Sequence, residues 1–286
     1  MHPFLAAVWR NNFFRVVMGI LLLLGPVLAG AVMLGHGLPS VVGVPLSIVG
    51  YLALVYLIER RSCTELSIKR AHYWVYGFVV GAVAFTATFA LIALLAHVDI
   101  TLSAGLTGLS QTASLMMAAA FFEELLFRGV IYRLSESSLG TTIAMVLSAV
   151  IFGLSHAFNP GASALSTISI ALQAGLLLAA AYTYSRTLWF PIGIHFAWNW
   201  FEGGVFGAAV SGGNVPGYFK SVFQGPNWVV GGVFGPEASI PANVVALCAF
   251  AIIATLAWRK GRWVSFREAR RARANDRFGR SLRDLQ

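Results

Sequence analysis

Apolar runs of about 20 residues recur along most of this chain, and a helix of that length can cross the hydrocarbon core of a bilayer. Of the 286 residues, 58% are hydrophobic and only 11% are charged, whereas a soluble domain has about 25% charged residues. The runs are too long and too rich in glycine to be strands of a membrane β-barrel. The sequence therefore predicts an all-α fold, a polytopic bundle of transmembrane helices.

Loop charges predict how this bundle is oriented, because lysine and arginine concentrate on the cytoplasmic side of a membrane. Eight spans fit the apolar pattern, and with eight spans 18 of the 20 basic residues fall on one side, together with both termini. The two exceptions are Lys220, on the opposite side, and Arg128, inside a span. We therefore expect both termini in the cytoplasm. The predicted spans are approximately residues 14–35, 41–58, 73–96, 112–134, 141–158, 162–184, 187–206 and 241–258.

The domain organisation follows from the same pattern. Residues 1–258 are expected to form a single helical domain, and residues 259–286 a basic cytoplasmic tail with ten lysines and arginines. Each such charge near an anionic lipid surface contributes about 1 kcal/mol, so we expect the tail to bind anionic lipid. Basic residues placed beside membrane spans argue against nucleic acid as a partner. The glycine-rich segment 203–241 on the other side is compatible with a re-entrant or an interfacial cap, and the sequence does not decide between them.

A few ionisable side chains remain inside the predicted spans. A charged side chain at the bilayer centre costs about 2.5–3.5 kcal/mol on insertion scales, so such residues face the bundle interior or a water-filled cavity and are functional candidates. They lie on three neighbouring predicted helices, which suggests one shared site. These residues are Glu123, Glu124, Arg128, His156 and His195, and the polar residues Asn199 and Glu202 follow on the last of the three helices.

Helical spacing separates the two adjacent glutamates. Glu124 and Arg128 are four residues apart, so they share a helix face and can form an ion pair. Glu123 lies about 100° further round the helix and has no such local partner. An unpaired carboxyl group in a low-dielectric cavity titrates nearer to neutrality, which suits a general base. We therefore expect Glu123 to react and the Glu124–Arg128 pair to hold its helix in place.

The histidines belong to two further helices. His195 and Asn199 are also four residues apart, and together they can offer two donors to an oxyanion, or act as a metal ligand and its supporting group. His156 has Phe152 one turn before it, most simply as a packing residue. At 1.5 Å per residue, Glu123 would lie ~16 Å, His195 ~12 Å and His156 ~22 Å from the cytoplasmic ends of their helices. That difference in depth is in tension with a single shared site, although helix tilt and the error in the span boundaries are large enough to absorb it.

Three short motifs occur in order along these helices. They are EELLFR from Glu123 to Arg128, FGLSH ending at His156, and HFAWN from His195 to Asn199. They match the EExxxR, FxxxH and HxxxN pattern of one family. The chain thus resembles the CAAX protease and bacteriocin-processing family of intramembrane proteases, which includes the type II CAAX prenyl endopeptidase and many bacterial abortive-infection and immunity proteins. The resemblance covers residues 112–206 closely.

What the resemblance implies is hydrolysis of a peptide bond within the membrane. The substrate would be a membrane-associated or lipidated protein or peptide, such as a prenylated CAAX protein. The enzyme would be an integral multi-pass membrane protein. If the host is a bacterium, the protein would be located in the plasma (inner) membrane. Glu123 would activate the water that His156 helps to bind, His195 and Asn199 would form the oxyanion site, and Glu124 with Arg128 would brace the helix.

Two mechanisms and two other functions stay open at this point. The site can work without a cofactor, or Glu123, His156 and His195 can hold a single divalent metal such as zinc, with water as the fourth ligand. If Glu123 were a ligand, another group would have to be the base, and this favours the metal-free mechanism. The alternative functions are a transporter or proton relay, since buried carboxyl and histidine chains also carry protons, and a non-catalytic immunity or scaffold protein of the same fold.

Overall fold

The computed structural model describes residues 11–34 and 40–281, and this part of the chain is mostly helical. Arg10 and Arg283, two of the basic residues used to predict the orientation, lie outside the described residues. The helices in chain order are α2 (Asn12–Leu34), α3 (Ser40–Ala53), the π-helix η1 (Leu54–Ile58), the 3₁₀-helix η2 (Ile68–Arg70), α4 (His72–Leu95), α5 (Gly105–Glu124), the π-helix η3 (Leu125–Tyr132), α6 (Arg133–Ser155), α7 (Ala164–Ile170), the π-helix η4 (Ala171–Gly175), α8 (Leu176–Ser185), α9 (Trp189–Asn199), the π-helix η5 (Trp200–Val205), α10 (Asn227–Val230), the 3₁₀-helix η6 (Pro236–Ala238), α11 (Ile240–Arg259) and α12 (Phe266–Ser281).

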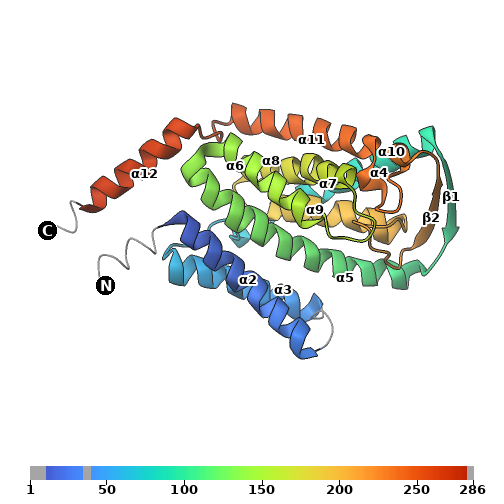
Figure 1. Ribbon diagram of the computed structural model, residues 1–286, viewed down its shortest axis with the longest axis horizontal. Helices are drawn as coiled ribbons and strands as arrows, with labels where there is room; N and C mark the ends of the chain where they lie inside the picture. Colours follow the sequence, from blue (N-terminus) through green and yellow to red (C-terminus); the bar gives the residue numbers. More distant parts are fainter. Residues whose placement is uncertain (1–10, 35–39, 282–286) are drawn as a thin grey trace.

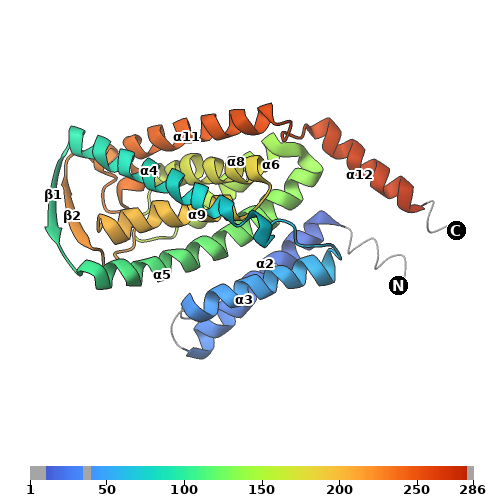
Figure 2. The same cartoon turned by 180° about the vertical axis from the view of Figure 1, so that it is seen from behind.

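The long helices run roughly along one direction, with α11 along one edge of the bundle and the α2–α3 pair along the opposite edge (Figure 1). The beginning of α2 and the whole of α12 lie at one end, as the view from behind also shows (Figure 2). Hydrogen bonds support this placement, because Ser138 contacts both Asn12 on α2 and Arg273 on α12. Both ends of the described chain are therefore on the same side of the bundle.

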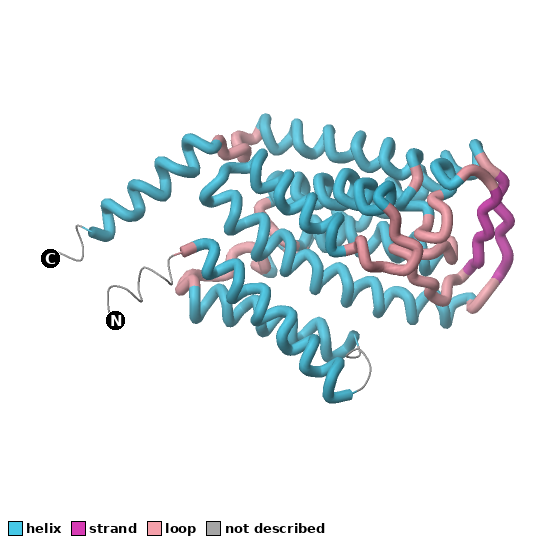
Figure 3. Tube along the Cα trace, in the orientation of Figure 1, coloured by secondary structure: helices cyan, strands magenta, loops and turns pink. Residues whose placement is uncertain are grey.

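A two-stranded antiparallel sheet closes the other end of the bundle (Figure 3). Strand β1 (His97–Leu102) pairs with β2 (Phe219–Gln224), in a register that sets Val98 opposite Phe223. The all-α prediction was therefore incomplete, although the chain is mostly helical. The segment HVDITL does alternate apolar and polar residues, a pattern with the period of a strand.

Each of the eight predicted spans contains a helix, and within the described residues four helical segments are long and apolar enough to cross a membrane. Two shorter apolar helices lie at Asn12–Pro26 and Val44–Ile58. Eight crossings therefore remain a prediction. The four long segments are His72–Leu95, Gly105–Ser155, Ala164–Ser185 and Ile240–Arg259.

The segment Gly105–Ser155 is bent at Gly140, which has a left-handed backbone with φ of 75°. A Cβ atom at this position would lie 2.8 Å from the main-chain nitrogen of Phe266, so the close approach of the tail also requires glycine. The sequence analysis ended the fourth helix too early, at residue 134. Counted from Gly140, Glu123 lies 17 residues back and His156 lies 16 residues on, about 25 Å along each helix. The predicted difference in depth between these two residues thus disappears.

Close packing of α4 against α9 fixes the helix that carries His195. A Cβ atom at Gly77 would lie 2.3 Å from the Phe190 carbonyl oxygen, and one at Gly193 would lie 2.3 Å from the Trp74 carbonyl oxygen. Small residues at such positions let two helix backbones touch, which is a common way to pack helices in membranes. The backbone of α9 is therefore held directly against α4.

The outer surface of the bundle is apolar. On α4, Val75, Val79 and Val83 follow one another at intervals of four residues and are each more than half exposed. The opposite face of α4 carries Gly77, which packs against α9. Such an extended apolar exterior suits contact with lipid rather than with water.

Candidate active site

A fully buried ion pair organises the centre of the bundle. Glu124 and Arg128 are both 0% exposed, and Arg128 Nη1 donates to Glu124 Oε1 at 2.7 Å. Arg128 Nη2 donates to the carbonyl oxygens of Ala174 at 2.9 Å and Gly175 at 3.3 Å, and the guanidinium group lies 4.5 Å from the centre of the Phe152 ring. The two carbonyls belong to the π-helix η4, whose wider turns change the usual i to i+4 hydrogen bonding and can leave carbonyl oxygens for other donors. The pair therefore joins α5 and η3 to η4 and α6.

Glu124 also holds His195. Its Oε1 atom lies 2.9 Å from His195 Nδ1, and a carboxylate can only accept, so Nδ1 carries a proton. This contact joins α5 to α9 across 71 residues of sequence. The sequence analysis placed Glu124 with Arg128 only, and no local signal indicates the second partner. The ring of His195 is thereby oriented with its Nε2 atom free for the site.

His156 is oriented by a similar contact. At the end of α6, its Nδ1 atom donates to the main-chain oxygen of Phe152 at 2.9 Å. The Nε2 atoms of His156 and His195 each lie 3.9 Å from the same atom, Glu123 Oε2. That oxygen is buried and has no hydrogen-bond partner among the residues that the structure describes. The structure thus brings Glu123, His156 and His195 together.

The spacing around Glu123 fits a water molecule. A separation of 3.9 Å is too long for a direct hydrogen bond, but a water can lie within ~2.8 Å of the carboxyl oxygen and of one histidine nitrogen. A carboxylate can accept one proton of that water, and a neutral imidazole nitrogen can accept the other. The arrangement can therefore hold and polarise a water molecule.

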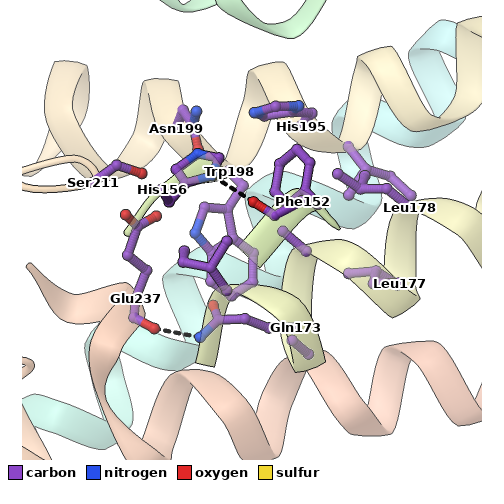
Figure 4. A pocket seen from close by; sticks show the side chains of 14 residues that line it. Phe152, His156, Gln173, Leu177, Leu178, His195, Trp198, Asn199, Ser211 and Glu237 are labelled. Carbon is purple, nitrogen blue, oxygen red and sulfur yellow. Dashed lines mark hydrogen bonds between the residues drawn. The ribbon is translucent and has the colours of Figure 1, made fainter. Parts of the chain in front are cut away.

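Beside the two histidines lies a cavity of about 30 Å³, which is enough for one or two water molecules (Figure 4). His156, His195 and Asn199 all line it, so Asn199 shares this space with both rings. The described residues that line this cavity do not include Glu123. The two histidines therefore lie between Glu123, which is near their Nε2 atoms, and the cavity, which they line.

The cavity wall includes residues that the sequence analysis missed. Glu237 and Ser211, from the segment 203–241, point into the same space as His156 (Figure 4). Gln173 on η4 also lines the cavity and donates to the main-chain oxygen of Glu237. The role of this segment was left open on sequence grounds. The structure shows that it forms part of the cavity wall as well as strand β2 of the sheet.

The three candidate metal ligands do not fit a zinc site as they are placed. Ligand atoms bound to tetrahedral zinc at ~2.1 Å lie about 3.4 Å from one another, whereas the Glu123–histidine separations are 3.9 Å. In residues 11–34 and 40–281, no three His, Cys, Asp or Glu side chains form a group that could hold a metal ion. We therefore derive no chemical step through a metal.

A second buried ion-pair cluster lies in the connection from η1 to α4. Burial raises the pKa of the Glu65 carboxyl group, but the hydrogen bond from Arg61 and the charge of Arg133 outweigh it and hold the pKa at about 2. Arg61 Nη1 donates to Glu65 Oε2 at 2.9 Å, and Tyr51 also donates to this carboxylate. The cluster ties this connection to α3 and to the beginning of α6.

Comparison with known proteins bears directly on this site. A family model described as type II CAAX prenyl endopeptidase Rce1-like matches residues 105–201, about a third of the chain. The chain carries an Rce1-like domain. The resemblance drawn from the three motifs is therefore confirmed. No curated protein and no solved structure matches the chain.

The Rce1-like domain runs from the start of α5 to the beginning of η5, so it contains every residue of the three motifs. The match to this family, together with the four helical segments of the described residues that are long and apolar enough to cross a membrane, indicates an integral membrane protein. Glu202 and Glu237 lie beyond the matched residues.

Proposed function

We propose that this protein is an intramembrane endopeptidase that hydrolyses a peptide bond in a membrane-associated or lipidated protein, with prenylated CAAX sequences as the first substrate class to test. One observation carries the proposal. Two histidine Nε2 atoms lie 3.9 Å from a single buried oxygen of Glu123 that lacks a hydrogen-bond partner in the described part of the chain. The Rce1-like family supports the reaction class.

In this mechanism Glu123 is the general base. A water molecule held between Glu123 and His156 gives one proton to the carboxylate while its oxygen attacks the carbonyl carbon of the substrate. His156 accepts the second proton of that water in a hydrogen bond, which orients the lone pair for attack. Because the Phe152 carbonyl oxygen keeps the proton on Nδ1, the Nε2 atom of His156 is free to accept.

His195 and Asn199 stabilise the oxyanion that forms on the substrate carbonyl. The Asn199 amide is a donor, and His195 Nε2 donates whenever the ring is doubly protonated, with the Glu124 carboxylate balancing its charge at 2.9 Å. Donors fixed in a water-poor cavity stabilise a developing charge better than mobile water does. Arg128 holds Glu124, and Glu124 in turn fixes the His195 ring.

The placement in the membrane is part of the proposal. The eight helical segments cross the bilayer eight times, and the end of the bundle that carries α12 faces the cytoplasm. This assignment agrees with the basic residues of α12, which then meet anionic lipid at the membrane surface. In a bacterial host the membrane is the plasma (inner) membrane.

Cleavage by the purified protein in lipid vesicles tests the proposal. The probe is a peptide that ends in a prenylated CAAX sequence, and mass spectrometry of the fragments identifies the bond that is cut. Glu123→Gln keeps the size of the side chain but removes the base, so we expect cleavage to fall by about 10²–10⁴-fold. The control is Glu268→Gln, which removes a carboxylate on α12 far from the site.

If E123Q cleaves the probe as fast as the wild type, the mechanism is wrong. A transporter or proton relay would instead show proton or solute flux across the vesicle membrane, and a scaffold would show neither flux nor cleavage.

A further inference from the structure

Two buried glutamates lie close together, and one of them, Glu237, lines the cavity. Glu202 on η5 is 0% exposed and Glu237 on η6 is 3% exposed, and Glu202 Oε1 lies 3.3 Å from the main-chain nitrogen of Glu237. Within the described residues, no lysine or arginine lies within 4.0 Å of either group. Two adjacent carboxylates without a cation cannot both stay ionised in a low-dielectric site. The pair therefore retains a proton.

The main chain of Glu237 is held from two sides. Its N–H group donates to Glu202 Oε1 at 3.3 Å, and its carbonyl oxygen accepts from the Gln173 side chain. The carboxyl group of Glu237 takes no part in these two hydrogen bonds. Its Oε1 atom is buried and has no hydrogen-bond partner in the described structure.

That carboxyl group is directed at the proposed reaction site. It points toward His156 and Ser211, not away from the cavity (Figure 4). His156 and Asn199 line the same cavity as Glu237. A substrate group that enters this space next to the histidines therefore meets Glu237 as well.

We propose that Glu237 is the general acid of the reaction and that Glu202 holds the proton on the pair until it is transferred. The inference rests on the proposed function. Water adds to the carbonyl carbon and gives one proton to Glu123. As the bond between carbon and nitrogen breaks, the proton of the pair moves to the departing nitrogen. The products at this point are a neutral amine and a carboxylic acid.

The remaining protons restore the site. Glu123 and the new carboxylic acid each hold one proton, and the pair holds none. One of these protons returns to Glu237 and the other converts the amine to an ammonium ion, leaving Glu123 and the product as carboxylates. The cycle therefore needs no reactant other than water.

The dependence of the rate on the leaving group distinguishes this role from a structural one. An amide nitrogen must be protonated to depart, whereas an alkoxide oxygen departs with much less help. The experiment uses the prenylated CAAX peptide and a matched peptide in which the scissile amide is replaced by an ester. Glu237→Gln is isosteric, and its main-chain contacts with Glu202 and Gln173 are unchanged. Thermal unfolding in detergent checks that the variant folds.

We expect E237Q to slow cleavage of the amide by about 10²–10⁴-fold and cleavage of the ester by less than about 10-fold. Glu202→Gln keeps an oxygen that can accept from the Glu237 N–H group. We expect this variant, like E237Q, to slow cleavage of the amide more than cleavage of the ester. Equal loss on both substrates, or no loss on either, overturns the inference. If the wild type cleaves neither peptide, the proposed function itself fails, and that result is distinct from cleavage that E237Q leaves unchanged.

Discussion

Removal of the buried guanidinium group is the strongest test of how this bundle is held together. In Arg128→Met, the Glu124 carboxylate remains 0% exposed but loses its cation, and the carbonyl oxygens of Ala174 and Gly175 lose their donor. Breaking a buried ion pair by removing one partner costs about 3–5 kcal/mol, because an uncompensated charge stays buried. Methionine fills much of the volume, so the loss reflects charge and hydrogen bonding rather than a cavity.

Reversible unfolding in mixed micelles, followed by circular dichroism, measures this loss of stability. The matched control is the double variant Glu124→Gln with Arg128→Met, which leaves no buried charge at the pair. The glutamine oxygen can still accept from His195 Nδ1, so the ring stays oriented. We expect the loss of unfolding free energy in the double variant to be smaller, by about 0.5–3 kcal/mol, than the sum of the losses in the two single variants. A loss below about 1 kcal/mol in R128M, or strict additivity in the double variant, would show that the pair does not support the fold.

Further predictions concern packing, pH and metal dependence. Gly193→Ala places a Cβ atom 2.3 Å from the Trp74 carbonyl oxygen and should cost about 1–3 kcal/mol, whereas Gly25→Ala, with nothing within 4 Å, should cost nothing; thermal unfolding compares them. The pKa of Glu65 is lowered from 4.5 to about 2, so its stabilisation is fully present above pH 4.5 and is lost as the pH falls toward 2. Over that pH range, the free energy of unfolding of the wild type should therefore fall by about 3 kcal/mol more than that of the Glu65→Gln variant. Because the ligand spacing does not fit zinc, a chelator such as 1,10-phenanthroline should leave cleavage unchanged, and loss restored by added zinc would contradict this reasoning.

Much of the helical architecture could be predicted because its signals are local. Apolar runs of membrane length mark a helix in each of the eight predicted spans. Glu124 and Arg128 sit four residues apart on one helix, so their pairing follows from helix geometry alone, and the structure shows it at 2.7 Å. The Rce1-like family was also recognisable, because its motifs are short patterns of residues close together in the sequence.

Contacts between distant segments could not be predicted in this way. The bond from His195 to Glu124 crosses 71 residues, and the contacts of Glu237 with Glu202 and Gln173 cross 35 and 64 residues. No helical or strand period relates such positions. Glu237 also lies in a glycine-rich segment, which has no periodic pattern to show which side chains turn inward.

The different surroundings of Glu123 and Glu124 follow from a single step along one helix. A rotation of about 100° per residue turns Glu124 toward Arg128 and His195, where its charge is balanced. The same rotation turns Glu123 toward the Nε2 atoms of both histidines, with one oxygen left without a hydrogen-bond partner among the described residues. Arg128 holds Glu124 in place, and Glu124 orients the His195 ring. The ion pair that stabilises the fold therefore also fixes the orientation of the ring that Glu123 faces. A substitution at Arg128 should therefore reduce catalysis even in variants that remain folded, through the orientation of His195.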